Sequence, residues 1–294
     1  MYRVMLLAHP KVLLSITSIP RRFNTALKEV VTKLQNGGNT VVVCLPNHYK
    51  KWGPAEAPDY LTGAGDVVLF RPSKDYGPAT KLLGAIEYIE STSQHFDGII
   101  TLDDDIYYAD TAAAVDYLKQ HARERPRCAI TIGGLKLEHY PYRNKNGLYG
   151  NNVGYVDAVV GFRGVYYPVN AITQDRRIFD FAAELPEFVY HNDDAYFGIC
   201  LSRMGIPIYA VKPPRTTSSR RRVELVCAQG AGESAVQEKM GAHRVENEME
   251  IYQYAVSKGW LPSREAGQNR DTPLGWLLKR TGLGRNLRRL YFNW

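Results

Sequence analysis

Short apolar runs rich in β-branched residues alternate with amphipathic helical stretches through the first 132 residues of this chain. Helices are predicted from Asn24, Pro78 and Asp110, because each of these residues suits a helix start and precedes apolar residues at helical spacing. Strands are predicted around them at 12–16, 40–45, 67–70, 98–102 and 129–132. This βαβ order is typical of an α/β fold in which helices cover a mainly parallel central sheet.

The rest of the chain is patterned less regularly. Residues 133–154 are rich in Gly, Asn and Tyr, which predicts a long loop or hairpin. A strand-rich segment follows at 156–167, and helices are predicted at 192–204 and 245–258. Two acidic residues open the predicted helix at 192–204.

The composition excludes several classes of protein. With 45% hydrophobic and 23% charged residues, the 294-residue chain is globular rather than disordered. Its apolar runs are shorter than the ~18 residues of a membrane-spanning helix, and a Pro and a Lys interrupt the apolar start, which argues against a signal peptide. Four widely spaced cysteines without a CxxC pair fit free thiols in a reducing compartment, so we expect a cytoplasmic protein.

The net charge of +7 is unevenly distributed. Residues 263–294 hold seven basic and two acidic residues, a net +5, which leaves +2 for residues 1–262. We therefore expect one folded domain over 1–262 and an appended basic tail over 263–294. A second basic cluster lies in the Pro-, Thr- and Ser-rich stretch 212–222, which predicts either an anion-binding loop or a solvated surface.

Three consecutive carboxylates, Asp103, Asp104 and Asp105, follow the predicted strand 98–102. Open α/β sheets bind ligands at the carboxyl ends of their strands. Like charges repel at close range, and a divalent cation shared between carboxylates and substrate phosphates offsets that repulsion. The segment therefore predicts a Mg²⁺ or Mn²⁺ site for a diphosphate. The alternative is a set of surface acids at the start of the next helix.

Two further segments suit an anion. DYGPATK at 75–81 places Lys81 in the first turn of a helix, where free N–H groups and the ammonium favour an anion. An ion pair between Lys81 and Asp75 is the alternative. SITSIPRR at 15–22 follows the first strand, where its hydroxyls could hold a base and its arginines a phosphate, or where it forms an ordinary polar loop.

SITSIPRRF near the start, DYGPATK in the middle and DDDIYY after a strand resemble, in order and spacing, a group of bacterial and large-virus glycosyltransferases. The resemblance covers roughly residues 11–260, and DYGPATK with the triple Asp is its specific part. It implies the Rossmann-like GT-A fold, with a nucleotide-binding half over about 1–132 and an acceptor half over about 133–262. It also implies metal-dependent transfer of a sugar from a nucleotide-sugar donor, first of all a UDP-sugar, to a glycan or lipid-linked saccharide, as in surface polysaccharide or glycolipid synthesis.

The resemblance implies roles for single residues. The triple Asp corresponds to the DxD motif, so Asp105 would bind Mn²⁺ or Mg²⁺ directly, while Asp103 and Asp104 would contact the sugar, the ribose or the metal through water. A late His often completes the metal shell in this fold, and His243 is the best placed, with His191 as the competitor. The other implied donor contacts are Thr17, Ser18, Arg21, Arg22, Asp75, Tyr76, Lys81, Arg220, Arg221 and Arg222.

HNDDAYFG at 191–198 resembles the acidic helix start of inverting GT-A enzymes, where a carboxylate takes the proton of the acceptor hydroxyl. The resemblance implies Asp194 as general base, with Asp193 as the second choice, because Glu-Asp is commoner there than this Asp-Asp pair. The alternative is that Asp193 or Asp194 only caps the helix. Without a base the reaction would be retaining.

The two basic segments suggest a lid and a membrane contact. The loop 212–222 is interpreted as a lid over the diphosphate. In the tail, apolar residues at helical spacing lie opposite Arg285, Arg288 and Arg289, a pattern typical of a helix on an anionic membrane. Residues 274–294 would then hold the enzyme at the inner face of the membrane. Packing of that helix on the domain or on a partner is the alternative.

Three other functions compete with sugar transfer. A sugar-1-phosphate nucleotidyltransferase would share the sheet and the metal, but should carry a Gly-rich phosphate loop where SITSIPRR stands. A haloacid-dehalogenase-like phosphatase would carry its aspartates after the first strand and not after the fourth. A module that binds nucleic acid or membrane without catalysis is disfavoured by the nearly balanced domain and its acidic cluster, so no nucleic-acid partner is expected.

Overall fold

The structure, a computed structural model, describes residues 10–35, 37–62, 65–135, 152–174, 178–179, 192–214, 224–229 and 253–259. By its internal contacts the chain divides into two units, Met1–Leu261 and Pro262–Trp294, and all described residues lie in the first. Several predicted features lie outside the described residues and remain predictions: residues 136–151, His191, Arg220, Arg221, Arg222, His243 and the tail 263–294.

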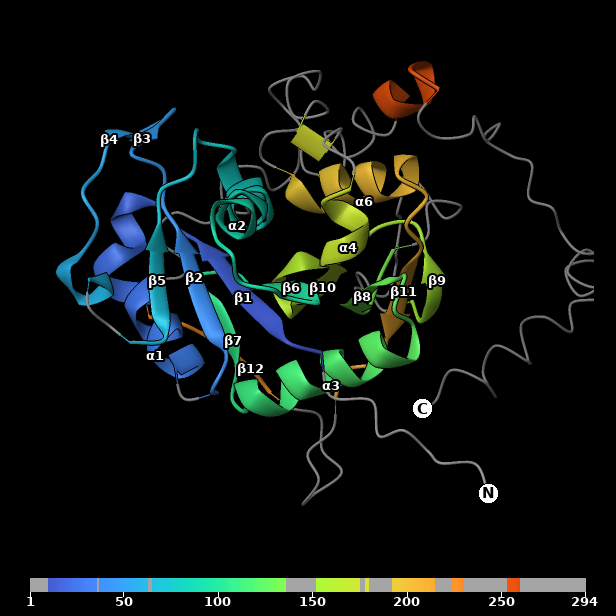
Figure 1. Ribbon diagram of the computed structural model, residues 1–294, viewed down its shortest axis with the longest axis horizontal. Coiled ribbons are helices and arrows are strands. Elements are labelled where there is room, and N and C mark those ends of the chain that lie inside the picture. The colour runs from blue at the N-terminus through green and yellow to red at the C-terminus, as the bar shows by residue number, and fades with distance from the viewer. Residues whose placement is uncertain are drawn as a thin grey trace, which may run out of the picture. The chain divides into compact units, whose positions relative to one another are not determined.

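An eight-stranded sheet forms the centre of the first unit, in the order β5-β2-β1-β6-β10-β8-β11-β9 (Figure 1). Its strands are β1 (Val12–Thr17), β2 (Thr40–Cys44), β5 (Val67–Phe70), β6 (Gly98–Thr101), β8 (Ala129–Ile132), β9 (Gly154–Val156), β10 (Val165–Pro168) and β11 (Ile208–Val211). Parallel pairing joins β5, β2, β1 and β6 in one run and β8 to β11 in another. Strands β10 and β9 are antiparallel to their neighbours. The predicted α/β fold with a mainly parallel sheet is confirmed.

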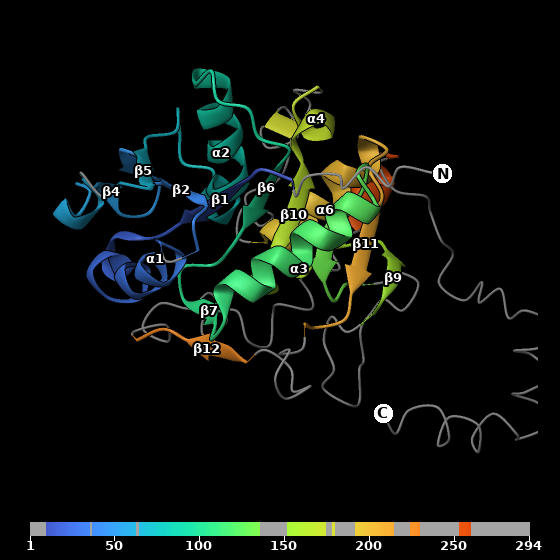
Figure 2. The same ribbon diagram turned by 60° about the horizontal axis from the view of Figure 1, so that its bottom comes forward.

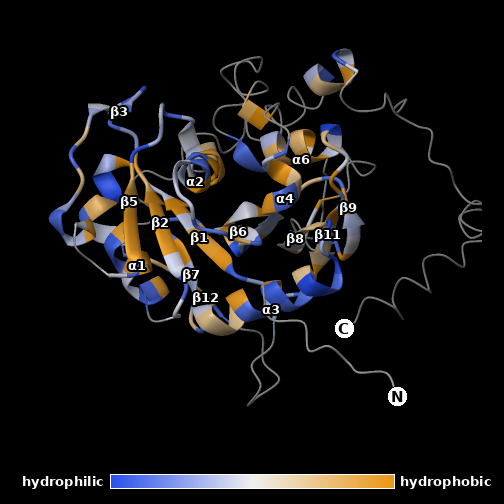
Figure 3. Ribbon diagram, in the orientation of Figure 1, coloured by the Kyte–Doolittle hydropathy of each residue, from blue (hydrophilic) through white to orange (hydrophobic). Residues whose placement is uncertain are grey.

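Helices cover both faces of this sheet, as Figure 1 shows. One face packs against α1 (Lys28–Gln35) and α3 (Thr111–Glu124). The other packs against α2 (Thr80–Ser91), α4 (Val169–Ile172) and α6 (Asp193–Arg203). Most residues of the strands are apolar and buried between these layers (Figure 3), whereas Tyr155 on β9 is exposed. Burying a Leu or Ile side chain contributes roughly 1.5–3 kcal/mol to the stability of the fold. The two apolar layers therefore fix the sheet and the positions of its strand ends.

The helix starts agree in part with the sequence. Asp110 caps α3 as predicted, because its side chain accepts a hydrogen bond from the N–H of Ala113 at 3.0 Å. The predicted cap at Asn24 is wrong. A 3₁₀ turn η1 (Pro20–Arg22) and a π-helix η2 (Phe23–Leu27) lead directly into α1, so Asn24 lies inside the helical segment. Pro20 starts that segment early because its fixed φ suits a first helical position.

A two-stranded antiparallel sheet fixes the chain that follows the triple Asp. β7 (Ile106–Tyr108) pairs with β12 (Leu225–Cys227), beside which it lies in Figure 2. Glu29 on α1 accepts hydrogen bonds from the Tyr107 hydroxyl at 2.7 Å and from the Gln229 N–H at 2.8 Å. The pair therefore joins two segments far apart in sequence, and both are tied to α1.

Several smaller elements lie along the chain between the strands of the central sheet. A second short antiparallel pair, β3 (His48–Tyr49) and β4 (Gly53–Pro54), follows β2, and a 3₁₀ turn η3 (Asp59–Leu61) precedes β5. A further 3₁₀ turn, η4 (Gly77–Ala79), leads into α2. In the described ranges, none of the helices has both the length and the apolar character needed to span a bilayer.

Candidate functional site

The strand order reverses at β1, which makes this place the topological switch point of the sheet. From β1 the sheet extends to β2 and β5 on one side and to β6 on the other, and all four strands are parallel. Open α/β sheets bind ligands in the crevice outside the carboxyl ends of the strands at such a point. The loop after β1 and the triple Asp after β6 both lie there.

The loop after β1 binds the triple Asp directly. The Arg22 guanidinium lies 2.7 Å from an Asp104 oxygen and 3.0 Å from an Asp105 oxygen. The Ser18 hydroxyl donates to the other Asp104 oxygen at 2.5 Å. Asp104 and Arg22 are both buried. Two predicted contact segments therefore meet, and Asp104 is held by its neighbours within the protein.

The DYGPATK segment forms the turn that presents Lys81 to the cluster. Asp75 accepts hydrogen bonds from the N–H of Gly77 at 2.8 Å and from the N–H of Lys50 at 2.9 Å. Gly77 has φ +61°, a left-handed conformation that favours glycine. Lys81 follows in the first turn of α2, and its ammonium lies 2.6 Å from Asp103. Both oxygens of Asp75 thus accept backbone hydrogen bonds, and the ion pair of Lys81 is formed with Asp103 and not with Asp75, which was the alternative to anion binding.

Helix α6 brings a second pair of carboxylates to the same place. Asp193 lies 2.7 Å from the Lys81 ammonium, and Asp194 accepts a hydrogen bond from the N–H of Gly161 at 2.8 Å. The helix cap is Asn192, whose side chain accepts from the N–H of Ala195 at 3.2 Å. The alternative that Asp193 or Asp194 caps the helix is therefore wrong. Both acids are left for other tasks.

Burial and mutual repulsion disturb the acids of this cluster. Burial first, then the charges of Asp103 and Asp104, raise the pKa of Asp105 to about 6. Burial raises the pKa of Asp104 as well, against the opposing effect of Arg22. Burial and the charge of Asp193 raise the pKa of Asp194. Carboxylates with raised pKa values in a crevice are typical of functional sites.

The donor set suits a hard divalent cation that is shared with a phosphate. Among the described residues, five carboxylates face only two protein cations, Arg22 and Lys81, so negative charge is in excess. The donors are all oxygens, which Mg²⁺ and Mn²⁺ prefer. In the described part of the chain, no group of three or more His, Cys, Asp or Glu side chains is arranged so that it could hold a metal ion by itself. A cation bound by these carboxylates would therefore need further ligands from the substrate.

Three residues predicted to contact the donor bind other groups or lie exposed in the described part of the chain. The Thr17 hydroxyl donates to the carbonyl of Cys44 at 2.7 Å, and the Tyr76 hydroxyl donates to Glu87 at 2.6 Å. Arg21 is exposed on the loop beside Arg22. Their predicted contacts with a donor remain predictions, and the structure does not bring these side chains into the carboxylate cluster.

Two residues of the cluster were not predicted from the sequence. Gly161 approaches Asp194 and Lys81 so closely that an added Cβ would overlap the Asp194 carboxylate. Tyr167 on β10 is fully buried, and burial raises its pKa well above the usual range while the charges of Lys81 and Asp194 act on it. A glycine that breaks a strand pattern was the signal for the first. An apolar strand gave no signal for the second.

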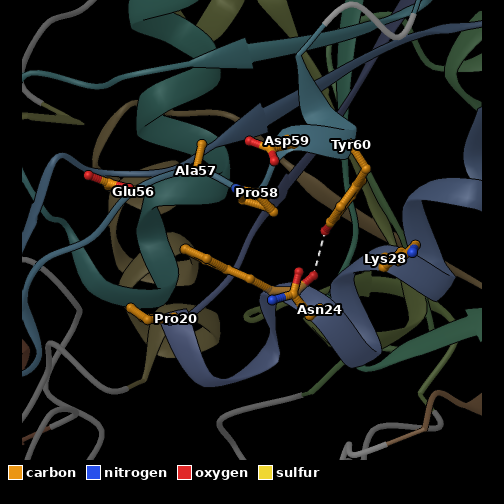
Figure 4. Close-up of a pocket in the computed structure, with 9 residues that line it drawn as sticks. Pro20, Asn24, Lys28, Glu56, Ala57, Pro58, Asp59 and Tyr60 are labelled. Atoms are coloured by element: carbon orange, nitrogen blue, oxygen red, sulfur yellow. Dashed lines mark hydrogen bonds between the residues drawn. The ribbon is translucent and has the colours of Figure 1, made fainter.

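A cavity of about 490 Å³ lies next to the loop after β1 (Figure 4). The Tyr60 hydroxyl donates to the carbonyl of Phe23 at 2.6 Å and closes one side of it. Its lining contains none of the five carboxylates, so the cavity is a neighbour of the charged cluster and not its centre. The residues that line it are Pro20, Phe23, Asn24, Lys28, Glu56, Ala57, Pro58, Asp59 and Tyr60.

Comparison with known proteins adds a likeness in fold. No protein-family model matches this sequence, and neither does any curated protein. Among solved structures, the chain is similar to a CMP:2-keto-3-deoxy-manno-octonic acid synthetase complexed with CTP. The two are 15% identical with a TM-score of 0.43, over 69% of this chain and 89% of that one. A likeness of this degree concerns the fold and does not transfer an activity.

Proposed function

We propose that this protein is a metal-dependent glycosyltransferase that moves a sugar from a nucleotide-diphosphate sugar to a hydroxyl of a saccharide acceptor. The observation that supports this most is the meeting of the triple Asp after β6 with the acidic start of α6 at the switch point of the sheet. The triple Asp suits the binding of a diphosphate together with its cation. The acidic start of α6 suits a side chain that accepts a proton.

The reaction requires three events at this site. The acceptor hydroxyl oxygen bonds to the anomeric carbon, the bond from that carbon to the diphosphate oxygen breaks, and the hydroxyl proton goes to a carboxylate. We assign the proton to Asp194 in its ionised form, because a carboxylate with a raised pKa is the stronger proton acceptor. Attack opposite the departing diphosphate inverts the anomeric carbon, and a nucleoside diphosphate is released.

Asp105 and Asp103 are the residues that would hold Mn²⁺ or Mg²⁺. The bound cation would neutralise charge on the departing diphosphate. Asp104 is held by Arg22 and Ser18, so it keeps the acidic loop in the conformation that presents its two neighbours. The predicted third ligand, His243, lies outside the described residues.

The test is turnover of a panel of nucleotide sugars with Mn²⁺, read as release of nucleoside diphosphate. Asp105→Ala and Asp194→Ala should each lower turnover by roughly 100-fold or more. Asp116→Ala is the matched control, because Asp116 is an exposed acid on α3 whose ion pair with Lys119 is 3.6 Å long. If both site variants keep full activity while the control behaves as wild type, the assigned site is wrong.

A sugar-1-phosphate nucleotidyltransferase is the second candidate. One solved structure similar to this chain is named CMP:2-keto-3-deoxy-manno-octonic acid synthetase, and that name agrees with this candidate better than with sugar transfer. The two reactions give different products. A nucleotidyltransferase joins a nucleoside triphosphate to a sugar or sugar phosphate and releases pyrophosphate, whereas a glycosyltransferase releases nucleoside diphosphate. Pyrophosphate release without nucleotide-sugar turnover would replace our proposal with this candidate.

A thermal-shift series identifies the nucleotide. UDP or GDP with Mn²⁺ should raise the melting temperature, since a ligand at 100 times its Kd stabilises by about 2.7 kcal/mol. Omitting Mn²⁺ should remove most of that shift. Stabilisation by CTP alone would favour the nucleotidyltransferase.

A further inference from the structure

Lys81 holds carboxylates from two separate parts of the sheet at once. Its ammonium lies 2.6 Å from Asp103, which follows β6, and 2.7 Å from Asp193, which opens α6. Asp103 belongs to the half predicted to bind the nucleotide and Asp193 to the half predicted to bind the acceptor. One buried cation therefore joins the two halves of the site.

The side chain of Lys81 has little freedom to do anything else. The residue is 4% exposed, and its carbonyl accepts a hydrogen bond from the Ser15 hydroxyl on β1 at 2.5 Å. The turn before it is fixed by Asp75, and Thr80 accepts from the N–H of Tyr76 at 3.1 Å. Both ends of Lys81 are thus held, the main chain by β1 and the ammonium by two carboxylates.

The same contacts distinguish the two acids of α6. Asp193 lies 2.7 Å from the Lys81 ammonium, so its carboxylate is already held by a cation. Asp194 accepts from the backbone of Gly161, and among the described residues no ion pair ties it to Lys81. Asp194 is therefore the acid of the two that the ammonium does not hold, and burial raises its pKa. That asymmetry is what a site with one proton acceptor and one structural acid requires.

We propose that Lys81 is a positioning residue that clamps Asp193 to Asp103 and so leaves Asp194 as the proton acceptor, with no contact of its own to the diphosphate. This inference rests on the proposed function for the role of Asp194. The clamp itself rests only on the geometry of Lys81, Asp103 and Asp193. The two parts can therefore fail separately.

The clamp is tested by a double-mutant cycle on stability. Lys81→Met leaves two partly buried carboxylates without their cation, so the urea midpoint should fall. Asp193→Asn in the same chain should restore part of the loss, because coupled residues are not additive. The cycle with Asp103→Asn should behave alike. Additive effects in both cycles would overturn the clamp, whether or not the protein turns over a nucleotide sugar.

The positioning role is tested by separating binding from turnover. Lys81→Met should lower kcat about 100-fold, as a displaced reacting group does, and should leave the Kd of UDP with Mn²⁺ nearly unchanged. A residue that binds the diphosphate would instead weaken that Kd by roughly tenfold or more. A weakened Kd with an unchanged kcat would therefore overturn the proposal.

Two further proteins keep this test decisive. Lys119→Met is the control, because Lys119 is a mostly buried lysine on α3, paired with Asp116 at 3.6 Å and distant in the fold from the cluster. It should keep both kcat and Kd. If Lys81→Met does not fold, Lys81→Met with Asp193→Asn removes one charge of each sign and provides the same comparison of kcat with Kd. If the wild type shows no turnover or nucleotide binding, the proposed function fails and the stability cycle alone decides the clamp.

Discussion

At the scale of single residues, Asp194 is both the expected proton acceptor and an acid whose burial costs stability. Its folded-state pKa is raised, so the folded protein holds the proton more tightly than the unfolded chain does. Stability from this group is present below the unfolded value near 3.9 and is lost as pH rises toward the folded value of about 8. The protein thus retains, at neutral pH, a carboxyl that destabilises its own fold.

Asp194→Asn should therefore stabilise the protein and inactivate it. Asparagine keeps an oxygen for the N–H of Gly161 and removes the buried charge. We expect a gain of roughly 0.5–2 kcal/mol at pH 8.5, and a gain near zero at about pH 3, where the wild-type acid is protonated in both states. Urea denaturation across this pH range measures the difference. A gain that is constant with pH would contradict the raised pKa of Asp194.

The four cysteines should differ sharply in reactivity. Cys44 and Cys200 are fully buried, and burial raises the pKa of the Cys44 thiol to about 12 and that of Cys200 above the usual range. Cys128 is buried and its pKa is also raised, whereas Cys227 is exposed on β12. Because the thiolate is the reactive form, DTNB should label one thiol rapidly in the native protein and four after denaturation. Cys227→Ser should remove the rapid phase, and a second rapid thiol would contradict the described burial.

At the scale of elements, two helices begin with caps of the same kind. Asn192 caps α6 beside the carboxylate cluster, and Asp110 caps α3 away from it. Replacing either residue with Ala should cost roughly 0.5–2 kcal/mol of stability. Only Asn192→Ala should also lower turnover, because the first turn of α6 carries Asp193 and Asp194. Urea midpoints and nucleoside diphosphate release, measured on both variants, check this. An equal loss of turnover in both variants would mean that Asn192→Ala lowers turnover only by destabilising the protein.

The strands and long helices were predictable because their signals are local. Strands 67–70 and 129–132 agree with β5 and β8 to the residue, since a short apolar run rich in β-branched residues favours a strand. The start of α1 was not predictable from Asn24, because Pro20 and a π-helix extend the helical segment toward the N-terminus. The contact between Gly161 and Asp194 spans 33 residues, and the glycine that interrupts the strand pattern at 156–167 does not indicate which residue it contacts.

At the scale of the whole molecule, the carboxylate cluster could be predicted only in part. The triple Asp and the DD pair were recognisable as acidic segments at element ends. The two segments meet at Lys81. The sequence predicts that Lys81 binds an anionic ligand, whereas in the structure its ammonium lies between Asp103 and Asp193. Side-chain pairing between distant elements is set by the order of the strands, and sequence periodicity does not contain that order.

The tail supplies the prediction that concerns the chain as a whole. Its basic and apolar residues predict binding to an anionic membrane, each basic residue contributing roughly 1 kcal/mol near the surface. Full-length protein should co-sediment with phosphatidylserine vesicles, and residues 1–262 alone should not. Arg285→Glu, Arg288→Glu and Arg289→Glu together in the full chain should also abolish binding. Equal co-sedimentation of all three proteins with the vesicles would contradict the prediction.

The position of β10 has a consequence for synthesis. Strands β6 and β8 are complete by residue 132, yet they do not pair with each other, because β10 at Val165–Pro168 lies between them. While the chain is being made, both strands keep an open edge until that later segment emerges, and open edges invite pairing with other chains. The first 132 residues are therefore defined as a half by the ligand they are predicted to bind, and they are not a unit of folding. The sheet that carries the site is completed only after the chain has passed its midpoint.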